Sequence, residues 1–188
     1  MKKYDMLSEF SELLTDELII TPLGYTSREF YSLGDRKQNF YFFGSMGMPV
    51  PFGLGVALST SETVFVFEGD GSILMNLGAL ATVGTYLPNN LKIIILDNGS
   101  YDSTGGQPTA SSLKTKLELV GKACGIIDYR VIDNIEEIKE TFKWLIEPGT
   151  KLVVAKILPG KTKVPRIDIS TEDIKERFYN YLNQTNNI

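Results

Sequence analysis

The sequence predicts an α/β fold: a single three-layer domain in which helices cover both faces of a mostly parallel sheet. Two observations predict it. Six short segments rich in β-branched or aromatic residues each have the length of a buried strand. Stretches whose apolar residues recur at helical spacing lie between them. This alternation is typical of parallel sheets, because a crossover between parallel strands needs a connection about the size of a helix.

The first half of the chain opens with helical spacing over residues 3–14. A strand follows at 17–21, where Leu-Ile-Ile forms a continuous apolar run. The next helix is expected over 27–33, before a strand at 39–43 that contains four aromatic residues. Apolar residues at helical spacing then predict a third helix over 50–58.

The second half continues the pattern with two nearly all-apolar strands, at 63–67 and 91–96. The remaining expected elements are a helix at 73–86, a helix at 113–124, a strand at 129–132, a helix at 135–146, a strand at 151–157 and a last helix near 171–182. Residues 159–169 lack a clear period and contain two prolines, so we expect them to run over the surface. One domain is therefore expected over residues 1–188, with a C-terminal extension over about 159–188.

Composition excludes several kinds of site. The chain has 188 residues, no histidine and one cysteine, Cys124. Histidine triads, histidine-ligated zinc, intramolecular disulfides and CxxC pairs are therefore excluded. The net charge of −4, without a long basic run, argues against nucleic acid as the main partner. No apolar run approaches the roughly 20 residues that span a bilayer, and the first ten residues are not signal-like, so we expect a cytoplasmic protein.

Two loops at the expected carboxyl edge of the sheet carry residues that could bind a phosphate and a metal ion. The first follows the third strand, opens a helix, and consists of Gly69, Asp70, Gly71 and Ser72. Its glycines let backbone N–H groups approach a phosphate, and the Asp70 carboxylate is favourable there if a cation such as Mg²⁺ lies between them. In the second loop, the Asn98 side chain and a backbone carbonyl such as that of Ser100 complete the oxygen ligands. Each loop alone is more typical of a tight turn, so their joint occurrence after consecutive strands supports the site.

These two loops also carry a family resemblance. GDG, a spacer of this length and then Asn form the signature of the diphosphate-binding domain of thiamine-diphosphate enzymes, which this sequence resembles. The resemblance implies the thiamine diphosphate-binding fold. It implies that Asp70, the Asn98 side chain and the Ser100 carbonyl bind Mg²⁺, while the backbone of Gly71 and Ser72 holds the diphosphate.

A loop after the second expected strand extends the resemblance. Residues Gly44, Ser45 and Met46 are similar to the family's loop that contacts the aminopyrimidine ring. There the Gly44 carbonyl would accept the 4′-amino group, and the Met46 side chain would support the V shape of the cofactor. A methionine after a strand is also typical of ordinary core packing.

Two further segments, TSRE at 26–29 and YDSTGGQPT at 101–109, are similar to segments of the sulfopyruvate and phosphonopyruvate decarboxylases. The β subunits of sulfopyruvate decarboxylase are the most similar of these. The resemblance implies substrate contacts from Arg28, Ser103, Thr104, Gly105, Gly106 and Gln107. Asp102 and Tyr101 are candidate catalytic residues, and Tyr101 is also a candidate cofactor contact. The first segment also fits a helix capping box, and the second a flexible polar loop.

The resemblance implies a lyase that uses thiamine diphosphate and Mg²⁺ to convert 3-sulfopyruvate to sulfoacetaldehyde and CO₂, as in the coenzyme M biosynthesis of methanogenic archaea. In this family, a glutamate from a separate pyrimidine-binding domain activates the cofactor. The length of this chain leaves no room for that domain. An α subunit that carries it is therefore the implied partner, in a hetero-oligomer.

Three alternatives stay open from the sequence. A split phosphonopyruvate decarboxylase, or another 2-oxo acid decarboxylase subunit, would use the same cofactor. A β subunit of a 2-oxo acid:ferredoxin oxidoreductase ranks lower, because Cys124 alone cannot hold an iron–sulfur cluster. A non-catalytic nucleotide-binding or regulatory module belongs to another class, in which Asp70 and Asn98 are turn residues. The chain lacks a complete GxGxxG or Walker A sequence to support that module.

Overall fold

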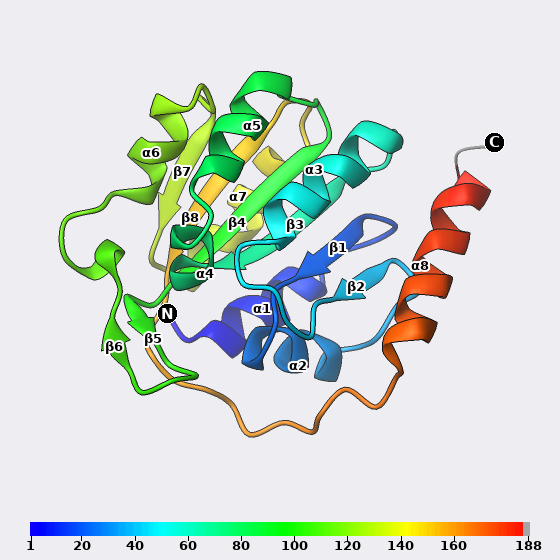
Figure 1. Cartoon of the computed structure of the whole chain (residues 1–188), viewed down its shortest axis with the longest axis horizontal. Helices are drawn as coiled ribbons and strands as arrows, with labels where there is room; N and C mark the ends of the chain where they lie inside the picture. Colours follow the sequence, from blue (N-terminus) through cyan, green and yellow to red (C-terminus); the bar gives the residue numbers. More distant parts are fainter. Residues whose placement is uncertain (186–188) are drawn as a thin grey trace.

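The computed structural model describes residues 1–185 as a six-stranded parallel sheet between helices (Figure 1). The strand order is β2-β1-β3-β4-β8-β7, and every neighbouring pair is parallel. The strands are β1 Leu18–Thr21, β2 Asn39–Tyr41, β3 Val64–Gly69, β4 Leu91–Asp97, β7 Tyr129–Ile132 and β8 Lys151–Lys156. The predicted α/β class, with its strands in the expected places, is confirmed.

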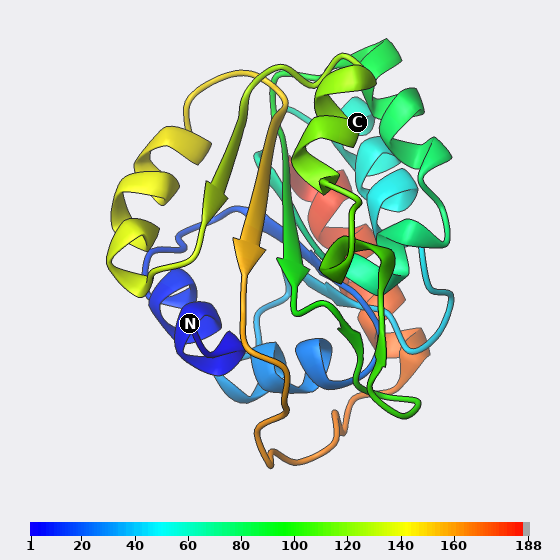
Figure 2. The same cartoon turned by 90° about the vertical axis from the view of Figure 1, so that its left-hand side faces the viewer.

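Helices cover both faces of the sheet, so the three-layer prediction is also confirmed. One face carries α1 Lys3–Ser11, α2 Tyr25–Ser32 and α7 Ile138–Leu145 (Figure 2). The other carries α3 Pro49–Ser59, α4 Asp70–Leu74, α5 Gly78–Tyr86 and α6 Leu117–Ala123. Alternate strand residues serve the two cores: Val64 and Val66 pack with α3 and α5, while Phe65 and Phe67 pack with α1.

The C-terminal helix α8, Thr171–Thr185, lies beside the edge strand β2. Its Phe178 and Tyr181 side chains are buried against the core on the α3 side. A helix in this place covers the unpaired backbone groups that an edge strand would otherwise expose. The end of the expected extension, residues 186–188, lies outside the described residues.

Three predicted helices differ from the structure. The helix expected over 73–86 is interrupted between α4 and α5, because the N–H groups of Met75 and Asn76 bond three residues back, to Ser72 and Ile73. The Asn76 side chain then donates to the Gly47 carbonyl at 2.9 Å. The helix expected over 113–124 begins only at α6, after a 3₁₀ turn, Ala110–Ser112. The one expected over 135–146 opens with another, Ile135–Glu137.

The connections beyond the carboxyl ends of the strands form the functional edge of the molecule. Strands β4, β7 and β8 point downward in Figure 2. Below them lie α2, the short hairpin of β5 Ser100–Tyr101 with β6 Gln107–Pro108, and the segment after β8. Residues 159–169 contain no helix or strand, as expected. Within residues 1–185, no helix is both long and apolar enough to cross a membrane.

Candidate functional site

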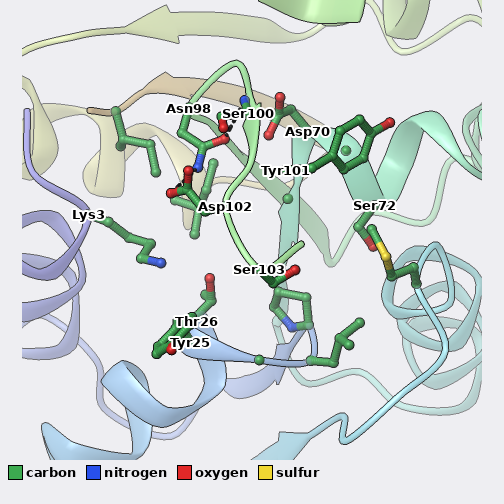
Figure 3. Close-up of a pocket in the computed structure, with 18 of the residues that line it drawn as sticks. Lys3, Tyr25, Thr26, Asp70, Ser72, Asn98, Ser100, Tyr101, Asp102 and Ser103 are labelled. Carbon is green, nitrogen blue, oxygen red and sulfur yellow. Dashed lines mark hydrogen bonds between the residues drawn. The ribbon is translucent and has the colours of Figure 1, made fainter. Parts of the chain in front are cut away.

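An open cavity of about 140 Å³ lies at the carboxyl ends of the central strands (Figure 3). Its walls come from the loops that follow β1, β3 and β4, from the start of α1 and from the segment after β8. In a parallel sheet this edge is where ligands bind, because loops rather than helices meet there. The two loops that the sequence singled out both reach this cavity.

The loop after β3 provides the floor of the cavity. Strand β3 ends at Gly69, and the five-residue helix α4 begins at Asp70. A side chain at Gly71 would be only 2.4 Å from the ring of Tyr101, so glycine is needed here for Tyr101 to pack over the loop. The Ser72 hydroxyl accepts a hydrogen bond at 2.8 Å from the N–H of Gly47. This bond joins the GDGS loop to the loop that follows β2.

Asp70 is the central carboxylate of the site. Its side chain is 2% exposed and lines the cavity. The hydroxyl groups of Thr109 and Ser111 donate to the same oxygen, Oδ2, at 2.5 and 2.9 Å. Burial raises the pKa of Asp70, and the two hydroxyl bonds oppose that change because they stabilise the ionised form. The hydroxyls thus hold an anionic oxygen ligand in one orientation.

Asn98 lies beside Asp70 because β3 and β4 are neighbours, with Gly69 opposite Leu96 in the register. Its Oδ1 accepts from the Ser100 N–H at 2.9 Å, and its Nδ2 donates to Asp102 Oδ2 at 2.9 Å. Asn98, Ser100 and Asp102 all line the cavity. The meeting of the two polar loops at one edge is as the sequence predicted.

These groups fit a hard divalent cation. A carboxylate, a side-chain amide oxygen and a backbone carbonyl are the oxygen ligands that Mg²⁺ prefers, with phosphate and water in the remaining positions. The part of the chain that the structure describes has no group of three or more His, Cys, Asp or Glu side chains placed to hold a metal. A site built around Asp70 would therefore depend on amide and carbonyl oxygens and on the ligand itself.

The loop after β2 is only partly in the cavity. Met46 lines it and is 36% exposed, whereas Gly44 and Ser45 are not among the lining residues. Ser45 adopts a positive φ of 63°, an uncommon conformation for a residue with a side chain. Gly47 is close-packed, since a Cβ there would be 2.7 Å from that of Asn76. Strand β2 ends at Tyr41, two residues before the predicted end at 43.

The predicted substrate and catalytic residues divide into two groups. Tyr101, Asp102 and Ser103 line the cavity. The others, which do not line it, are Arg28, Thr104, Gly105, Gly106 and Gln107. The last four lie in the turn and second strand of the β5–β6 hairpin. Arg28 instead borders a second groove together with Phe43 and Arg166.

Some residues of the site were missed from the sequence. Thr109 ends the polar run that was singled out, but no pattern indicated its bond to Asp70. Ser111 bonds both Asp70 and the buried Asp97, at 2.9 and 2.8 Å. Lys3 lines the cavity from the start of α1. The sequence around the GDGS loop gives no sign of Thr109, Ser111 or Lys3, because all three come from distant parts of the chain.

Comparison with known proteins agrees with this geometry. Residues 24–155 match the family model described as thiamine pyrophosphate enzyme, C-terminal TPP binding domain; the pyrophosphate and diphosphate names denote the same cofactor. The benzoylformate decarboxylase of Polynucleobacter necessarius superimposes with a TM-score of 0.72 over 87% of this chain and 34% of that one, at 17% identity. That likeness supports the fold.

Relatives of known name are closer in sequence. The chain is 42% identical over 181 residues to sulfopyruvate decarboxylase subunit beta of Methanococcus maripaludis, covering 96% of this chain and 97% of the relative. It is 40% identical to the sulfopyruvate decarboxylase of Methanosarcina acetivorans, covering 95% of this chain but 46% of that longer protein. It is 41% identical to the phosphonopyruvate decarboxylase of Streptomyces viridochromogenes, over 89% of this chain and 43% of the relative. The chain thus belongs to the thiamine pyrophosphate enzyme family, of which it carries the C-terminal, cofactor-binding domain.

Proposed function

We propose that this chain is the diphosphate-binding subunit of a thiamine-diphosphate-dependent decarboxylase that converts 3-sulfopyruvate to sulfoacetaldehyde and CO₂. The observation that supports it best is the end-to-end similarity to a sulfopyruvate decarboxylase β subunit. The placement of Asp70 and Asn98 on one cavity supplies the matching chemistry.

Five residues that line the cavity would hold the cofactor. Asp70, Asn98 and the Ser100 carbonyl would bind Mg²⁺, and backbone N–H groups of Gly71 and Ser72 would bind the diphosphate. When bound, thiamine diphosphate supplies the electron sink that accepts the electron pair released as CO₂ leaves. The chain's own contribution is to fix the position of that group.

Several side chains orient the residues that would bind the metal and the cofactor, rather than contacting the substrate. Thr109 and Ser111 hold the Asp70 carboxylate by hydrogen bonds that favour its ionised form. Asp102 accepts from the Asn98 Nδ2, and the Ser100 N–H donates to the Asn98 Oδ1; the two bonds fix the amide, whose oxygen retains a second lone pair for Mg²⁺. The Tyr101 ring packs directly on Gly71 of the loop.

The proposal includes a partner subunit. The relative from M. maripaludis is named as a β subunit, and the relative from M. acetivorans is a single chain of about twice the matched length. An α subunit that provides the pyrimidine-binding domain and the activating glutamate would complete the active site. The exposed side chains of Phe43, Met46 and Met48 lie in the loop beside the cavity, where such a subunit would pack.

Titration calorimetry of the chain with its α subunit tests the cofactor site. We expect thiamine diphosphate to bind in the presence of Mg²⁺ and to lose affinity when the metal is removed. Asp70→Ala should weaken binding by roughly 100-fold or more, because it removes the one carboxylate ligand. Asp16→Ala is the matched control, since Asp16 is exposed and outside the cavity. Binding that is absent, or independent of Mg²⁺, contradicts the proposal.

Phosphonopyruvate is the second candidate substrate, supported by the similarity to the Streptomyces enzyme. Both candidates are 2-oxo acids with a second anionic group, so the cofactor chemistry is the same. The ratio of kcat/KM for sulfopyruvate to that for phosphonopyruvate, measured on the reconstituted pair, decides between them. A larger kcat/KM for phosphonopyruvate would replace the sulfonate assignment.

A further inference from the structure

The start of α1 places a cation in the candidate cofactor cavity. Lys3 is the only basic residue among the described residues that line the cavity, and its side chain is 11% exposed. Figure 3 shows its amine directed into the space below Asn98 and Asp102. The remaining charged lining residues are carboxylates, Asp70 and Asp102.

Several contacts hold Lys3 in place. Helix α1 packs on the sheet through Met6, Leu7 and Phe10, which are at most 2% exposed. The Leu158 N–H donates to the Met1 carbonyl at 2.8 Å, which joins the start of the chain to the end of β8. The position of the amine is therefore set by tertiary contacts on both sides of it.

The Lys3 amine also has an acidic neighbour. Its Nζ lies 3.4 Å from Oε2 of Glu29, a fully buried carboxylate of α2. The other oxygen of Glu29 accepts from the Thr162 N–H at 2.8 Å. An ammonium group has three donors, and the ion pair with Glu29 is long, so Lys3 retains donors for a ligand in the cavity.

The charge of the cavity favours such a ligand contact. Mg²⁺ neutralises two negative charges, but a diphosphate together with the Asp70 and Asp102 carboxylates brings more than two. Uncompensated negative charge in a partly buried site is costly. Lys3 is placed to offset part of that excess.

We propose that Lys3 binds the terminal phosphate of the cofactor's diphosphate, an inference that rests on the function proposed above. The orientation follows from the two sides of the cavity. Ser72, bonded to the loop that carries Met46, lies on the side opposite Lys3, and Asp70 and Asn98 lie between them (Figure 3). If the aminopyrimidine lies toward Met46, the free end of the diphosphate points to Lys3.

A competing explanation is that Lys3 only neutralises Glu29. A pair of ligands separates the two roles, because thiamine monophosphate lacks the terminal phosphate. Calorimetry measures the affinity of the reconstituted α/β pair for each of the two ligands, thiamine diphosphate and thiamine monophosphate, with Mg²⁺ present. The affinity of the weaker ligand is measured by displacement. Lys2→Met is the matched control, since it removes the same charge from an exposed neighbour outside the cavity.

We expect Lys3→Met to weaken binding of thiamine diphosphate by about 10-fold and to leave thiamine monophosphate unaffected. Lys3→Arg should restore most of the affinity. The double variant Lys3→Gln with Glu29→Gln removes both partners of the ion pair without a buried unpaired charge, and it should show the same selective loss if Lys3→Met does not fold.

Two results would overturn the inference alone. One is an equal loss of affinity for both ligands, which a structural role for Lys3 predicts. The other is unchanged affinity for thiamine diphosphate in Lys3→Met. If the wild-type pair does not bind thiamine diphosphate at all, the proposed function fails, and the inference fails with it.

Discussion

The two ends of the β4–β8 pair both bury charged residues, but in opposite ways. At the amino end, Lys92 lies opposite Lys151 in the register. The Lys92 side chain is 1% exposed, and its amine donates to the carbonyls of Asn89, Glu147 and Gly149. All three donors of the ammonium group are bonded to backbone carbonyls, so none is left for a ligand at this end. Burial lowers the pKa of Lys92 to about 8.

At the carboxyl end, Asp97 lies opposite Lys156, with which it forms an ion pair. The Ser111 hydroxyl lies 2.8 Å from Asp97 Oδ1 and 2.9 Å from Asp70 Oδ2 at the cavity, so its single proton is shared between the two carboxylates. Here an ammonium group, a backbone N–H and side-chain hydroxyls all contact the buried carboxylates, and the network ends at an open cavity. A buried charge is therefore not by itself a sign of function, whereas one whose network reaches a cavity is.

The largest expected effect is at the amino end. Lys92→Met should lower the free energy of unfolding by about 4 kcal/mol, because it removes three charge-assisted hydrogen bonds from a buried ammonium group to part-buried carbonyls. Cofactor affinity of the folded protein should not change, since Lys92 lies at the end of the sheet away from the cavity. Urea denaturation and calorimetry measure the two quantities. Lys143→Met, at an exposed position of α7, serves as the control, and a parallel loss of cofactor affinity would contradict the division between the two ends.

The next effect concerns a buried carboxylate at the carboxyl end of β3. Glu68 is fully buried, its Oε2 has no hydrogen-bond partner among the described residues, and burial raises its pKa to about 7. The folded state therefore keeps the proton that the unfolded state releases near its ordinary pKa of 4.5. Stability should fall as pH rises from the unfolded pKa to the folded one, and level off above it.

Glu68→Gln should remove this dependence. We expect the variant to exceed the wild type in free energy of unfolding by up to about 3 kcal/mol near pH 8, with almost no difference near pH 4. Denaturation of the cofactor-free chain at several pH values measures the difference, with the exposed Glu176→Gln as control. A difference that does not vary with pH would show that Glu68 is ionised in the folded state.

The smallest expected effect is at Asp102, which touches the cavity but not the core. Its Oδ2 accepts from Asn98 Nδ2 at 2.9 Å and from the Gly160 N–H at 2.8 Å. Asp102→Ala should weaken Mg²⁺-dependent cofactor binding by about 10-fold, because the Asn98 amide loses its orientation. The free energy of unfolding should change little. A fall in kcat with unchanged cofactor affinity would assign Asp102 to the substrate instead.

Much of the site could be predicted because its main residues sit next to strand ends. The strands are continuous apolar runs, so the carboxyl edge could be located, and parallel neighbours bring Asp70 and Asn98 to one place. The interruption at Asn76 could not be predicted, since its cause is a bond to Gly47 in another loop. The β5–β6 hairpin pairs only two residues per strand, too few for a periodic signal.

By itself, the sequence determined the fold class, the order of the elements, the glycine loop with its aspartate and the absence of histidine and disulfide chemistry. Those properties depend on local composition and on spacing along the chain. Only the tertiary structure decided that Thr109 and Ser111 hold Asp70, that Asp102 orients Asn98 and that Lys3 faces the same cavity. Apart from the Asp102–Asn98 bond, which spans only four residues, these contacts join segments that are distant in sequence. They form only because the packing of helices and loops on the sheet brings their side chains together.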